Sequence, residues 1–313
     1  MESNFIERTE CPACGGAQSL EIYRCGFGED PIKTFLDDFY RFQGGIEHEY
    51  LEGFNYVLEE CRGCGLVFQK HILNDALMER LYERWIDPGQ AIVHEQEQKD
   101  FKRLTHYASE IMSVVAFLGR EPRELSFLDF GMGWGRWCQM AQSFGCHVAG
   151  MELSPARIEN ARKLGIEIVE WQDLPQREFD FINTEQVFEH IPEPLETLRH
   201  LVRALKPGGL VKISVPEGSG IRKKLRIGDW SAPKRSKNTL NPVSPLEHIN
   251  CFKRSTIFQK AELTGLEPVR ISGRITKAYR VNQKPLTAFF KALMKPAYQR
   301  IFNRGTYQFL QMK

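Results

Sequence analysis

The stretch from 126 to 152, SFLDFGMGWGRWCQMAQSFGCHVAGME, constrains the fold more than any other part of the chain. It opens with a short apolar run at 127–130 that is bounded by glycine, which predicts a buried parallel strand. Three glycines follow at alternate positions, Gly131, Gly133 and Gly135. Because glycine lacks a Cβ, such a loop can adopt positive φ angles and let its backbone approach a ligand. A helical pattern and a second apolar run ending in Glu152 complete a unit that predicts a nucleotide-binding site.

Strand and helix patterns continue to alternate after this unit. We expect strands at 127–130, 148–152, 166–170, 179–183, 209–215 and 266–272. Ser154 and Pro155 are typical of the N-cap and first residue of an intervening helix. Alternation of this kind predicts an α/β fold in which helices cover both faces of a doubly wound parallel sheet.

The glycine loop alone does not identify the nucleotide, because NAD, FAD and S-adenosylmethionine sites all use one. Two residues argue against a dinucleotide. Arg136 stands where the dinucleotide pattern requires a third glycine for close helix packing. Asp129 lies two residues before the first glycine, where its carboxylate would repel a pyrophosphate but could face a cationic group.

Five segments in a fixed order decide between these cofactors. They are LDFGMGWG at 128–135, VAGME at 148–152, EWQDLP at 170–175, FDFINTEQVFEHIP at 179–192 and LRHLVRALKPGGLVKISVP at 198–216. Together they resemble the class I S-adenosylmethionine-dependent methyltransferases, across about residues 105–283. The resemblance implies a Rossmann-like, seven-stranded methyltransferase sheet.

The same resemblance implies roles for individual residues in binding S-adenosylmethionine. The glycine loop would hold the methionine part of the cofactor, next to Asp129. Glu152 would bind the ribose hydroxyls, and Asp173 would meet the adenine amino group. Residues from Asn183 to Gln186 would face the methionine and the acceptor.

Four residues are candidate catalytic groups, because methyl transfer to a hydroxyl, amine or carbon acid commonly needs a general base. His190 follows the strand that faces the substrate and is the first choice, although it could instead cap a loop. His248 lies in a His-x-x-x-Phe segment like those that border the pocket in similar methyltransferases, and its alternative is a packing role. Glu185 and Tyr107 could also reach the pocket.

Two paired-cysteine motifs, CPACG and CRGCG, predict a metal site near the N-terminus. Their cysteines are Cys11, Cys14, Cys61 and Cys64. Two residues between cysteines let both thiolates bind one tetrahedral ion at about 2.3 Å, and the following glycine permits the tight turn. Four such ligands predict a structural zinc ion. Iron in a rubredoxin-like site is the rival metal, and disulfides are disfavoured because the chain shows no secretory signal.

The arrangement of these motifs resembles two groups of zinc-containing methyltransferases. In bacterial methyltransferases of sugar and polysaccharide biosynthesis, a similar module leads through CGLVF-like residues into a helical connector, and 64–68 read CGLVF here. Ribosomal RNA guanine methyltransferases have closer-set ligands. The 46 residues between Cys14 and Cys61 fit the sugar methyltransferases better.

Positive charge is concentrated at the C-terminal end of the chain. Residues 221–313 hold 20 Lys and Arg against 4 acidic residues, so they carry +16, while the whole chain carries +2. An anionic acceptor or RNA would suit such a surface, and so would a solvated basic face. The basic loop 216–250 could clamp phosphate groups, with Trp230 available for stacking.

The expected organisation has four parts. They are a zinc-binding module at 1–74, a helical connector at 75–118, a methyltransferase domain at 119–283 that contains the basic loop, and a basic amphipathic segment at 284–313. That last segment could contact a membrane surface or mediate dimerisation. Without an apolar run of about 18 residues or a signal-peptide pattern, we expect a cytoplasmic protein.

These observations predict methyl transfer from S-adenosylmethionine to a small molecule. The favoured acceptor is a sugar, nucleotide-sugar or glycan precursor. The resemblance of the zinc module to that of sugar methyltransferases and the basic loop both support it. The alternative is an RNA methyltransferase, or a nucleic-acid-binding zinc protein that uses the basic C-terminal third.

Overall fold

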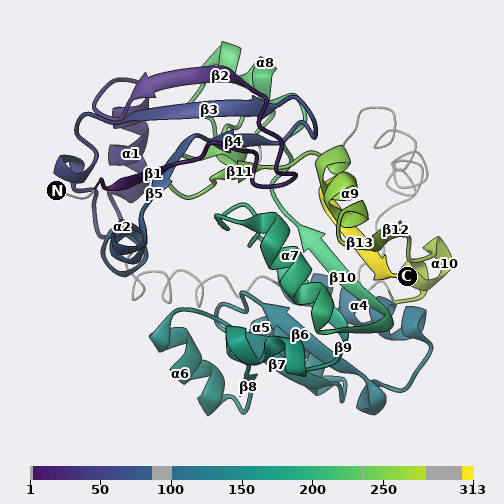
Figure 1. Ribbon diagram of the computed structural model, residues 1–313. Coiled ribbons are helices and arrows are strands. Elements are labelled where there is room, and N and C mark those ends of the chain that lie inside the picture. Colours follow the sequence, from purple (N-terminus) through teal and green to yellow (C-terminus); the bar gives the residue numbers. More distant parts are fainter. Residues whose placement is uncertain (1–2, 87–100, 235, 280–304) are drawn as a thin grey trace. The chain divides into compact units, whose positions relative to one another are not determined.

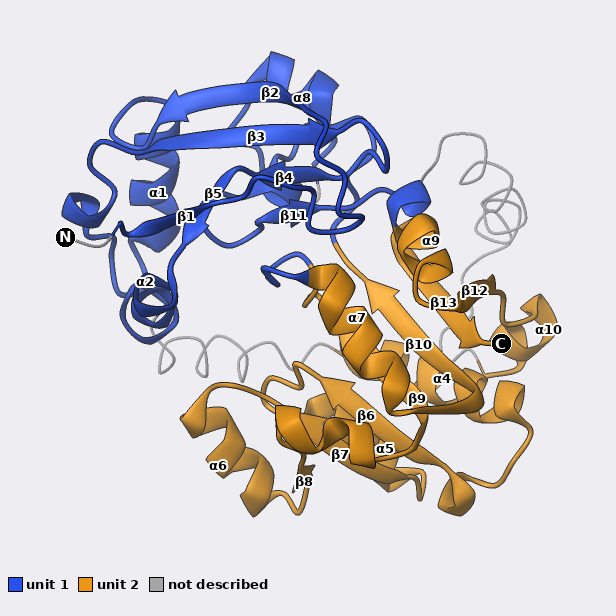
Figure 2. Ribbon diagram, viewed as in Figure 1, with its two compact units in different colours: residues 1–99, 189–193, 216–256 blue, residues 100–188, 194–215, 257–313 orange. Residues whose placement is uncertain are grey.

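Two units, each with its own β-sheet, make up the chain in the computed structural model (Figure 2). The first unit comprises residues 1–99, 189–193 and 216–256, and the second comprises 100–188, 194–215 and 257–313. The structure describes residues 3–86, 101–234, 236–279 and 305–313. No described helix is long and apolar enough to cross a bilayer.

A seven-stranded mixed sheet forms the centre of the second unit (Figure 1). Its strands are β6 (Ser126–Phe130), β7 (His147–Met151), β8 (Glu167–Ile168), β9 (Phe179–Glu185), β10 (Leu205–Ser214), β12 (Leu266–Val269) and β13 (Tyr307–Met312). They lie in the order β12-β13-β10-β9-β6-β7-β8. The five strands from β10 to β8 run parallel, whereas β13 is antiparallel to both of its neighbours. This arrangement confirms the predicted α/β, Rossmann-like, seven-stranded fold.

The strand order reverses at one place in this sheet. From β6 the chain moves outward through β7 to β8, and it then returns to β9 on the other side of β6. In open α/β sheets, ligands bind outside the carboxyl ends of the strands at such a reversal. The carboxyl ends of β6 and β9 therefore mark the expected ligand site.

Helices pack against this sheet because its central strands are apolar on both faces. Phe127 and Leu128 are neighbours in β6 that point to opposite faces, and both are fully buried. One core cluster combines Phe127 and Phe181 with apolar side chains of three of the helices. The helices are α4 (Phe101–Leu118), α5 (Arg136–Ser143), α6 (Pro155–Lys163), α7 (Pro194–Arg203), α9 (Arg254–Glu262) and α10 (Gly273–Ala278), with short 3₁₀ turns η3 (Pro122–Glu124) and η4 (Trp171–Gln176).

Most predicted strands are present, with differences at their ends. The strand expected at 166–170 is only two residues long, and β10 begins at Leu205, four residues before the strand predicted at 209–215. Ser154 precedes α6 as predicted, but its side chain makes no capping hydrogen bond. β13 lies in the predicted amphipathic segment 284–313, where the sequence did not indicate a strand. Residues 284–304 of that segment are outside the described residues.

The first unit contains two antiparallel sheets. β1 (Phe5–Glu7) pairs with β5 (His71–Leu73), and β2 (Ser19–Gly26), β3 (Asn55–Cys61), β4 (Val67–Gln69) and β11 (Asn250–Cys251) form a sheet in the order β11-β4-β3-β2. Its helices are α1 (Ile32–Tyr40), α2 (Asp75–Arg80) and α8 (Ile221–Ile227), with shorter turns η1 (His48–Tyr50), η2 (Leu81–Trp85) and η5 (Asn241–Val243). Asn74 caps α2 by accepting a hydrogen bond from the Leu77 amide at 2.9 Å.

Residues 216–256 contribute to the core of the first unit, whereas the sequence placed the basic loop in the methyltransferase domain. Ile221 and Leu225 of α8 pack into the same cluster as Tyr56, and β11 pairs with β4. Trp230 belongs to this core as well, with only 7% of its surface exposed. The expectation that Trp230 is available to stack on a ligand is therefore wrong. Residues 87–100 of the predicted connector lie outside the described residues.

Candidate functional site

The glycine loop lies at the carboxyl end of β6, next to the reversal in strand order. Gly131, Gly133 and Gly135 all have positive φ angles, of 75°, 56° and 75°, which glycine adopts without strain. A Cβ at Gly131 would lie 2.6 Å from Val187, and one at Gly135 would lie 2.5 Å from Ile166. At Gly133 no described atom lies within 4 Å of that position. The first and third glycines thus allow close packing, whereas the second leaves its backbone open to a ligand.

Glu152 follows the second strand, and backbone hydrogen bonds fix its carboxylate against the loop. The Gly133 amide donates to Oε2 at 3.0 Å, and the amides of Leu153 and Ser154 donate to Oε1 at 2.9 and 3.1 Å. Arg157 lies 3.6 Å from Oε2. The loop and this acidic side chain therefore form one rigid arrangement, as a ribose-binding carboxylate requires.

Asp129 and Asn183 lie side by side at the carboxyl ends of β6 and β9. The Asn183 amide donates to Asp129 Oδ1 at 2.7 Å, and the Cys138 thiol donates to Oδ2 at 3.6 Å. Burial raises the pKa of Asp129 to about 7, although these hydrogen bonds oppose the rise. Asn183 Oδ1 is buried and has no hydrogen-bond partner among the described residues. It is an acceptor suited to a ligand's N–H group.

Asp173 lies in η4, the turn that follows β8. It is exposed to solvent, and its amide donates to the Glu170 carbonyl at 3.1 Å. An exposed carboxylate in this turn is free to meet an incoming polar group. The carboxylate predicted to meet the adenine amino group therefore follows β8, at the surface of the second unit.

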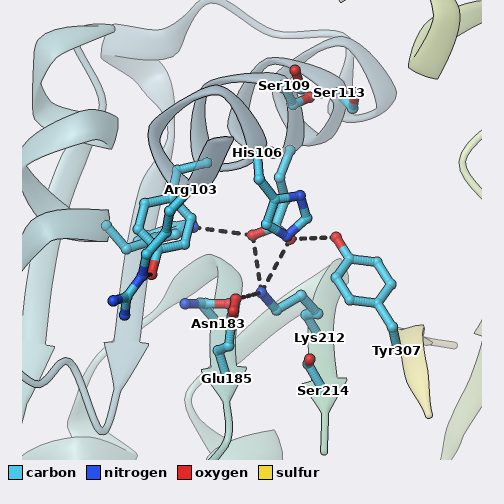
Figure 3. Close-up of polar contacts among 12 residues, drawn as sticks. Arg103, His106, Ser109, Ser113, Asn183, Glu185, Lys212, Ser214 and Tyr307 are labelled. Atoms are coloured by element: carbon cyan, nitrogen blue, oxygen red, sulfur yellow. Dashed lines mark hydrogen bonds and ion pairs between the residues drawn. The ribbon is translucent and has the colours of Figure 1, made fainter. Parts of the chain in front are cut away.

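A buried lysine organises the polar residues beyond the end of β9 (Figure 3). Lys212 Nζ in β10 lies 3.0 Å from Glu110 Oε1 and 2.8 Å from Glu185 Oε2, and its side chain is fully buried. Glu110 projects from α4, and it also accepts hydrogen bonds from the Trp137 indole at 3.0 Å and from the Tyr307 hydroxyl. The cluster therefore connects side chains from α4, α5, β9, β10 and β13 through hydrogen bonds and ion pairs.

Attraction between these charges has a larger effect on their pKa values than burial does. Burial alone would lower the pKa of Lys212, but the carboxylates of Glu110 and Glu185 raise it above the usual range. Burial likewise opposes ionisation of Glu110, yet Lys212 and His106 keep its pKa below the usual range. Both groups are consequently charged at neutral pH. Glu185 has 30% of its side chain exposed, so this network presents a fixed carboxylate to solvent or to a ligand.

The predicted catalytic residues fall into both units. Glu185 belongs to the second unit, together with Tyr107, whose hydroxyl accepts a hydrogen bond from Arg103 at 2.8 Å. His190 and His248 belong to the first unit, where their ring centroids are 4.9 Å apart. Hydrogen bonds hold the segments that carry them: Asn250 donates to the Ile191 carbonyl at 2.6 Å, and Arg8 donates to the Pro192 carbonyl at 3.0 Å.

Burial governs the protonation of both histidines. It lowers the pKa of His190 to about 3, aided by the nearby His248, and it lowers the pKa of His248 to about 4. Both imidazoles are therefore neutral near pH 7. The side chain of Glu189 is also buried, and it lies 4.0 Å from His190 Nε2.

The four predicted metal ligands meet in the first unit. The Sγ atoms of Cys11 and Cys64 are 3.5 Å apart, those of Cys14 and Cys61 are 3.6 Å apart, and all four lie within 4.8 Å of one another. Sulfur atoms around a tetrahedral zinc ion, at bond lengths of about 2.3 Å, are about 3.8 Å apart. The donor set and its spacing therefore fit a structural zinc ion.

Backbone geometry explains how the two cysteine motifs achieve this convergence. The Gly15 amide donates to the Cys11 carbonyl at 2.8 Å, and the Gly65 amide donates to the Cys61 carbonyl at 3.0 Å. Both glycines have positive φ angles, of 69° and 72°. Each motif therefore turns back on itself in the same way, as the glycine after each pair predicted.

Glu110, Lys212 and Tyr307 were not predicted from the sequence as site residues. Two of them carried a local signal. Lys212 interrupts the apolar run of a central strand, LVKIS, where a charged residue must find a buried partner. Glu110 lies beside Ile111 on the buried side of α4. Pairing them required the tertiary structure, because they are far apart in the chain.

Comparison with known proteins gives a family match over most of the second unit. A family profile described as "Methyltransferase domain" matches residues 96–271. That range includes the glycine loop, Glu152, and both Glu185 and Lys212. It covers more than half of the chain.

Individual relatives are more distant. Norajmaline N-methyltransferase of Rauvolfia serpentina is 24% identical over 71% of this chain and 76% of its own length. Ubiquinone biosynthesis O-methyltransferase of Xanthomonas oryzae pv. oryzae is 25% identical over 50% of this chain and 72% of its own length. Among solved structures, the plantazolicin methyltransferase BamL, in complex with a triazolic desmethylPZN analog and SAH, is 15% identical with a TM-score of 0.48, over 75% of this chain and 94% of its own.

Proposed function

This chain belongs to the methyltransferase-domain family and is an S-adenosylmethionine-dependent methyltransferase, and we propose that it methylates a small, polar acceptor. The favoured acceptor is a sugar, nucleotide-sugar or other glycan precursor. The observation that carries the proposal is the fixed carboxylate of Glu185 beside the glycine-loop strand, held by buried Lys212. Such a group can accept a hydrogen bond from an acceptor hydroxyl or ammonium.

The cofactor would bind at the reversal in strand order of the second unit. We propose that the glycine loop and Asn183 contact the methionine part, with Asp129 behind them. Glu152 would accept hydrogen bonds from the ribose hydroxyls, and Asp173 would meet the adenine amino group. The open backbone at Gly133 and the unpartnered Asn183 oxygen support this fit.

Methyl transfer demands little covalent chemistry from the protein. The sulfonium is already a leaving group, so the acceptor atom must be aligned with the methyl carbon and lose a proton. Alignment can contribute about 7–11 kcal/mol of barrier reduction. We propose that Glu185, His190 or His248 is the group that accepts this proton.

The four cysteines would hold zinc as a structural ion. When bound, zinc supplies a cross-link among four chain positions in the first unit. The thiolates of Cys11, Cys14, Cys61 and Cys64 would complete its coordination, so no position would remain for a substrate.

The names of the relatives support a small acceptor, since one refers to norajmaline and the other to ubiquinone biosynthesis. The module that precedes the methyltransferase domain, with its CGLVF segment, supports a glycan precursor. Two of the basic residues considered for an RNA surface are already in ion pairs, because Arg222 and Lys253 both contact Glu60. We therefore favour the small acceptor over RNA.

Two measurements test this proposal. Calorimetry should detect binding of S-adenosylmethionine, and binding of NAD alone would overturn the cofactor assignment. Formation of S-adenosylhomocysteine should then be measured with nucleotide sugars, amine and phenol acceptors, and RNA. We expect turnover with a sugar-containing acceptor and a shallow dependence on salt. Turnover with RNA alone, falling steeply with salt because counterions are released, would overturn the acceptor class.

A further inference from the structure

We propose that Glu189, His190 and His248 form a second metal site in the first unit, one that binds a divalent first-row transition ion. One carboxylate oxygen and two imidazole nitrogens lie within 4.8 Å of one another. Ligand atoms around a zinc-like ion, at bond lengths of about 2.0–2.2 Å, are about 3.3–3.6 Å apart. Small side-chain movements would therefore bring the three groups onto one ion.

Hydrogen bonds orient the two imidazoles for this role. His248 Nδ1 contacts the Asn241 carbonyl oxygen, and because a carbonyl only accepts, Nδ1 carries the hydrogen. The lone pair of the neutral ring is then on Nε2. His190 Nδ1 lies 3.3 Å from the Tyr82 hydroxyl, which leaves Nε2 toward Glu189. Histidines that bind metals usually have this kind of partner on the second ring nitrogen.

The cluster is largely buried, but an ion from solvent can reach it. The Glu189 side chain is 1% exposed, so its carboxylate lies below the surface together with the two imidazoles. His190 has a quarter of its side chain exposed, so an ion from solvent can reach the cluster.

Comparison with a third cluster shows what distinguishes this site. His106, Glu110 and Glu185 in the second unit also bring potential ligand atoms within 4.8 Å of one another. There, however, Lys212 Nζ lies 2.8–3.1 Å from oxygens of both carboxylates. The ammonium group thus takes the place that an ion would need. Of these two clusters of histidine and carboxylate side chains, we expect a metal at the Glu189 cluster and not at the Lys212 cluster.

The donor set indicates the class of ion. Two imidazoles and a carboxylate suit Mn²⁺, Fe²⁺, Co²⁺ or Zn²⁺, whereas thiolates like those of the four-cysteine cluster prefer softer metal ions. Three protein ligands would leave at least one open position for water or for an oxygen of a bound molecule. The inference replaces the proton-accepting role proposed above for His190 and His248, because an imidazole nitrogen that binds an ion cannot also accept a proton. It goes beyond the proposed function, because the site would bind its ion without S-adenosylmethionine or an acceptor.

Manganese provides a selective test, because Mn²⁺ prefers oxygen and nitrogen ligands to the four thiolates. Full-length protein should be titrated with Mn²⁺ and the free ion measured by electron paramagnetic resonance. We expect one ion bound per chain and, in pulsed spectra, couplings to imidazole nitrogen. An absence of binding at millimolar Mn²⁺, or a bound ion without nitrogen coupling, would overturn the proposal.

Matched variants locate the ion. His190→Ala, His248→Ala and Glu189→Gln should each weaken Mn²⁺ binding at least tenfold, while His147→Ala, at an exposed histidine of β7, should not. Near-ultraviolet circular dichroism reports whether each variant is folded. Glu189→Gln keeps the size of the side chain, so it serves as the test where an alanine variant fails to fold. Unchanged binding in all folded variants would contradict the site.

Discussion

The two units gather buried polar groups in different ways. In the second unit, the carboxylates of Glu110 and Glu185 converge on an ammonium group of the chain itself, Lys212. In the first unit, four thiols converge at one point, and two neutral imidazoles and a carboxylate converge at another. The second unit therefore carries its own counter-charge, whereas the geometry of the first unit suits ions taken from solution. We therefore predict that the stability of the second unit depends on its own side chains alone, whereas the stability of the first unit also depends on bound metal.

Loss of a thiolate ligand should have the largest effect. A structural zinc ion contributes about 10–16 kcal/mol of apparent binding free energy, which is coupled to folding. Cys61→Ser should therefore abolish stoichiometric zinc binding and lower the melting temperature of the first unit. Cys25→Ser changes a cysteine of the same unit outside the cluster and should alter neither. Zinc content by mass spectrometry and calorimetric melting measure both, and equal effects of the two variants would contradict a zinc site.

Removal of the internal cation should destabilise the second unit. Lys212→Met would leave Glu110 buried without its ammonium partner, at a cost of about 3–5 kcal/mol. Chemical denaturation should show this loss, and the Lys212→Met/Glu110→Gln double variant should recover part of it. Lys163→Met, which breaks an exposed pair with Glu159, should cost less than about 1 kcal/mol. A Lys212→Met variant as stable as Lys163→Met would remove the contrast between the units.

Replacement of a catalytic candidate should affect turnover more than cofactor binding. His190→Ala should lower the turnover number by about 10²–10⁴-fold, the range expected for loss of a group that assists proton transfer. The dissociation constant of S-adenosylmethionine should change little. Steady-state kinetics and calorimetry separate the two quantities. Equal losses in both would reject the catalytic assignment of His190.

Glu152→Gln should weaken cofactor binding by about tenfold to a hundredfold. A hydrogen bond to a charged group contributes about 1.5–3 kcal/mol, and glutamine keeps the size of the side chain. Glu159→Gln, at an exposed position of α6, provides the control. Calorimetry with S-adenosylmethionine tests this effect, and similar affinities of the two variants would argue against the ribose contact.

The last prediction concerns the pH dependence of stability. The pKa of Asp129 is raised to about 7 in the folded state, from 3.8 in the unfolded chain. Between these values the folded state binds more protons, so this carboxyl's contribution to stability decreases as pH rises from about 4 to 7. Asp129→Asn should remove that decrease, which unfolding measurements across this range would reveal. Parallel pH profiles for both proteins would contradict the raised pKa.

Features encoded locally were predictable from the sequence. The glycine loop needs only glycines at alternate positions after a buried strand, and the four-cysteine cluster needs only two short motifs. The fold class followed from the alternation of strands and helices. These patterns depend on residues close together in the chain, so propensity and spacing were sufficient.

Features that depend on distant residues were not predictable in the same way. Lys212 and Glu110 meet although 102 positions separate them. Trp230 looked like part of a solvated basic loop, but its indole packs with Tyr23 and Tyr56 in a core built from other segments. β13 lies between β10 and β12 in the sheet and pairs with both. Nothing near Tyr307 in the sequence indicates those partners.

The first unit is assembled from three separate pieces of chain, 1–99, 189–193 and 216–256. A single cut after residue 99 would therefore not release it as an independent fragment. The N-terminal piece would lack β11 beside β4, and it would expose the surface that Ile221 and Trp230 cover. The remainder would carry those apolar residues without their core. Expression of either part by simple truncation should give insoluble protein, and a permuted or grafted design would have to carry all three pieces together.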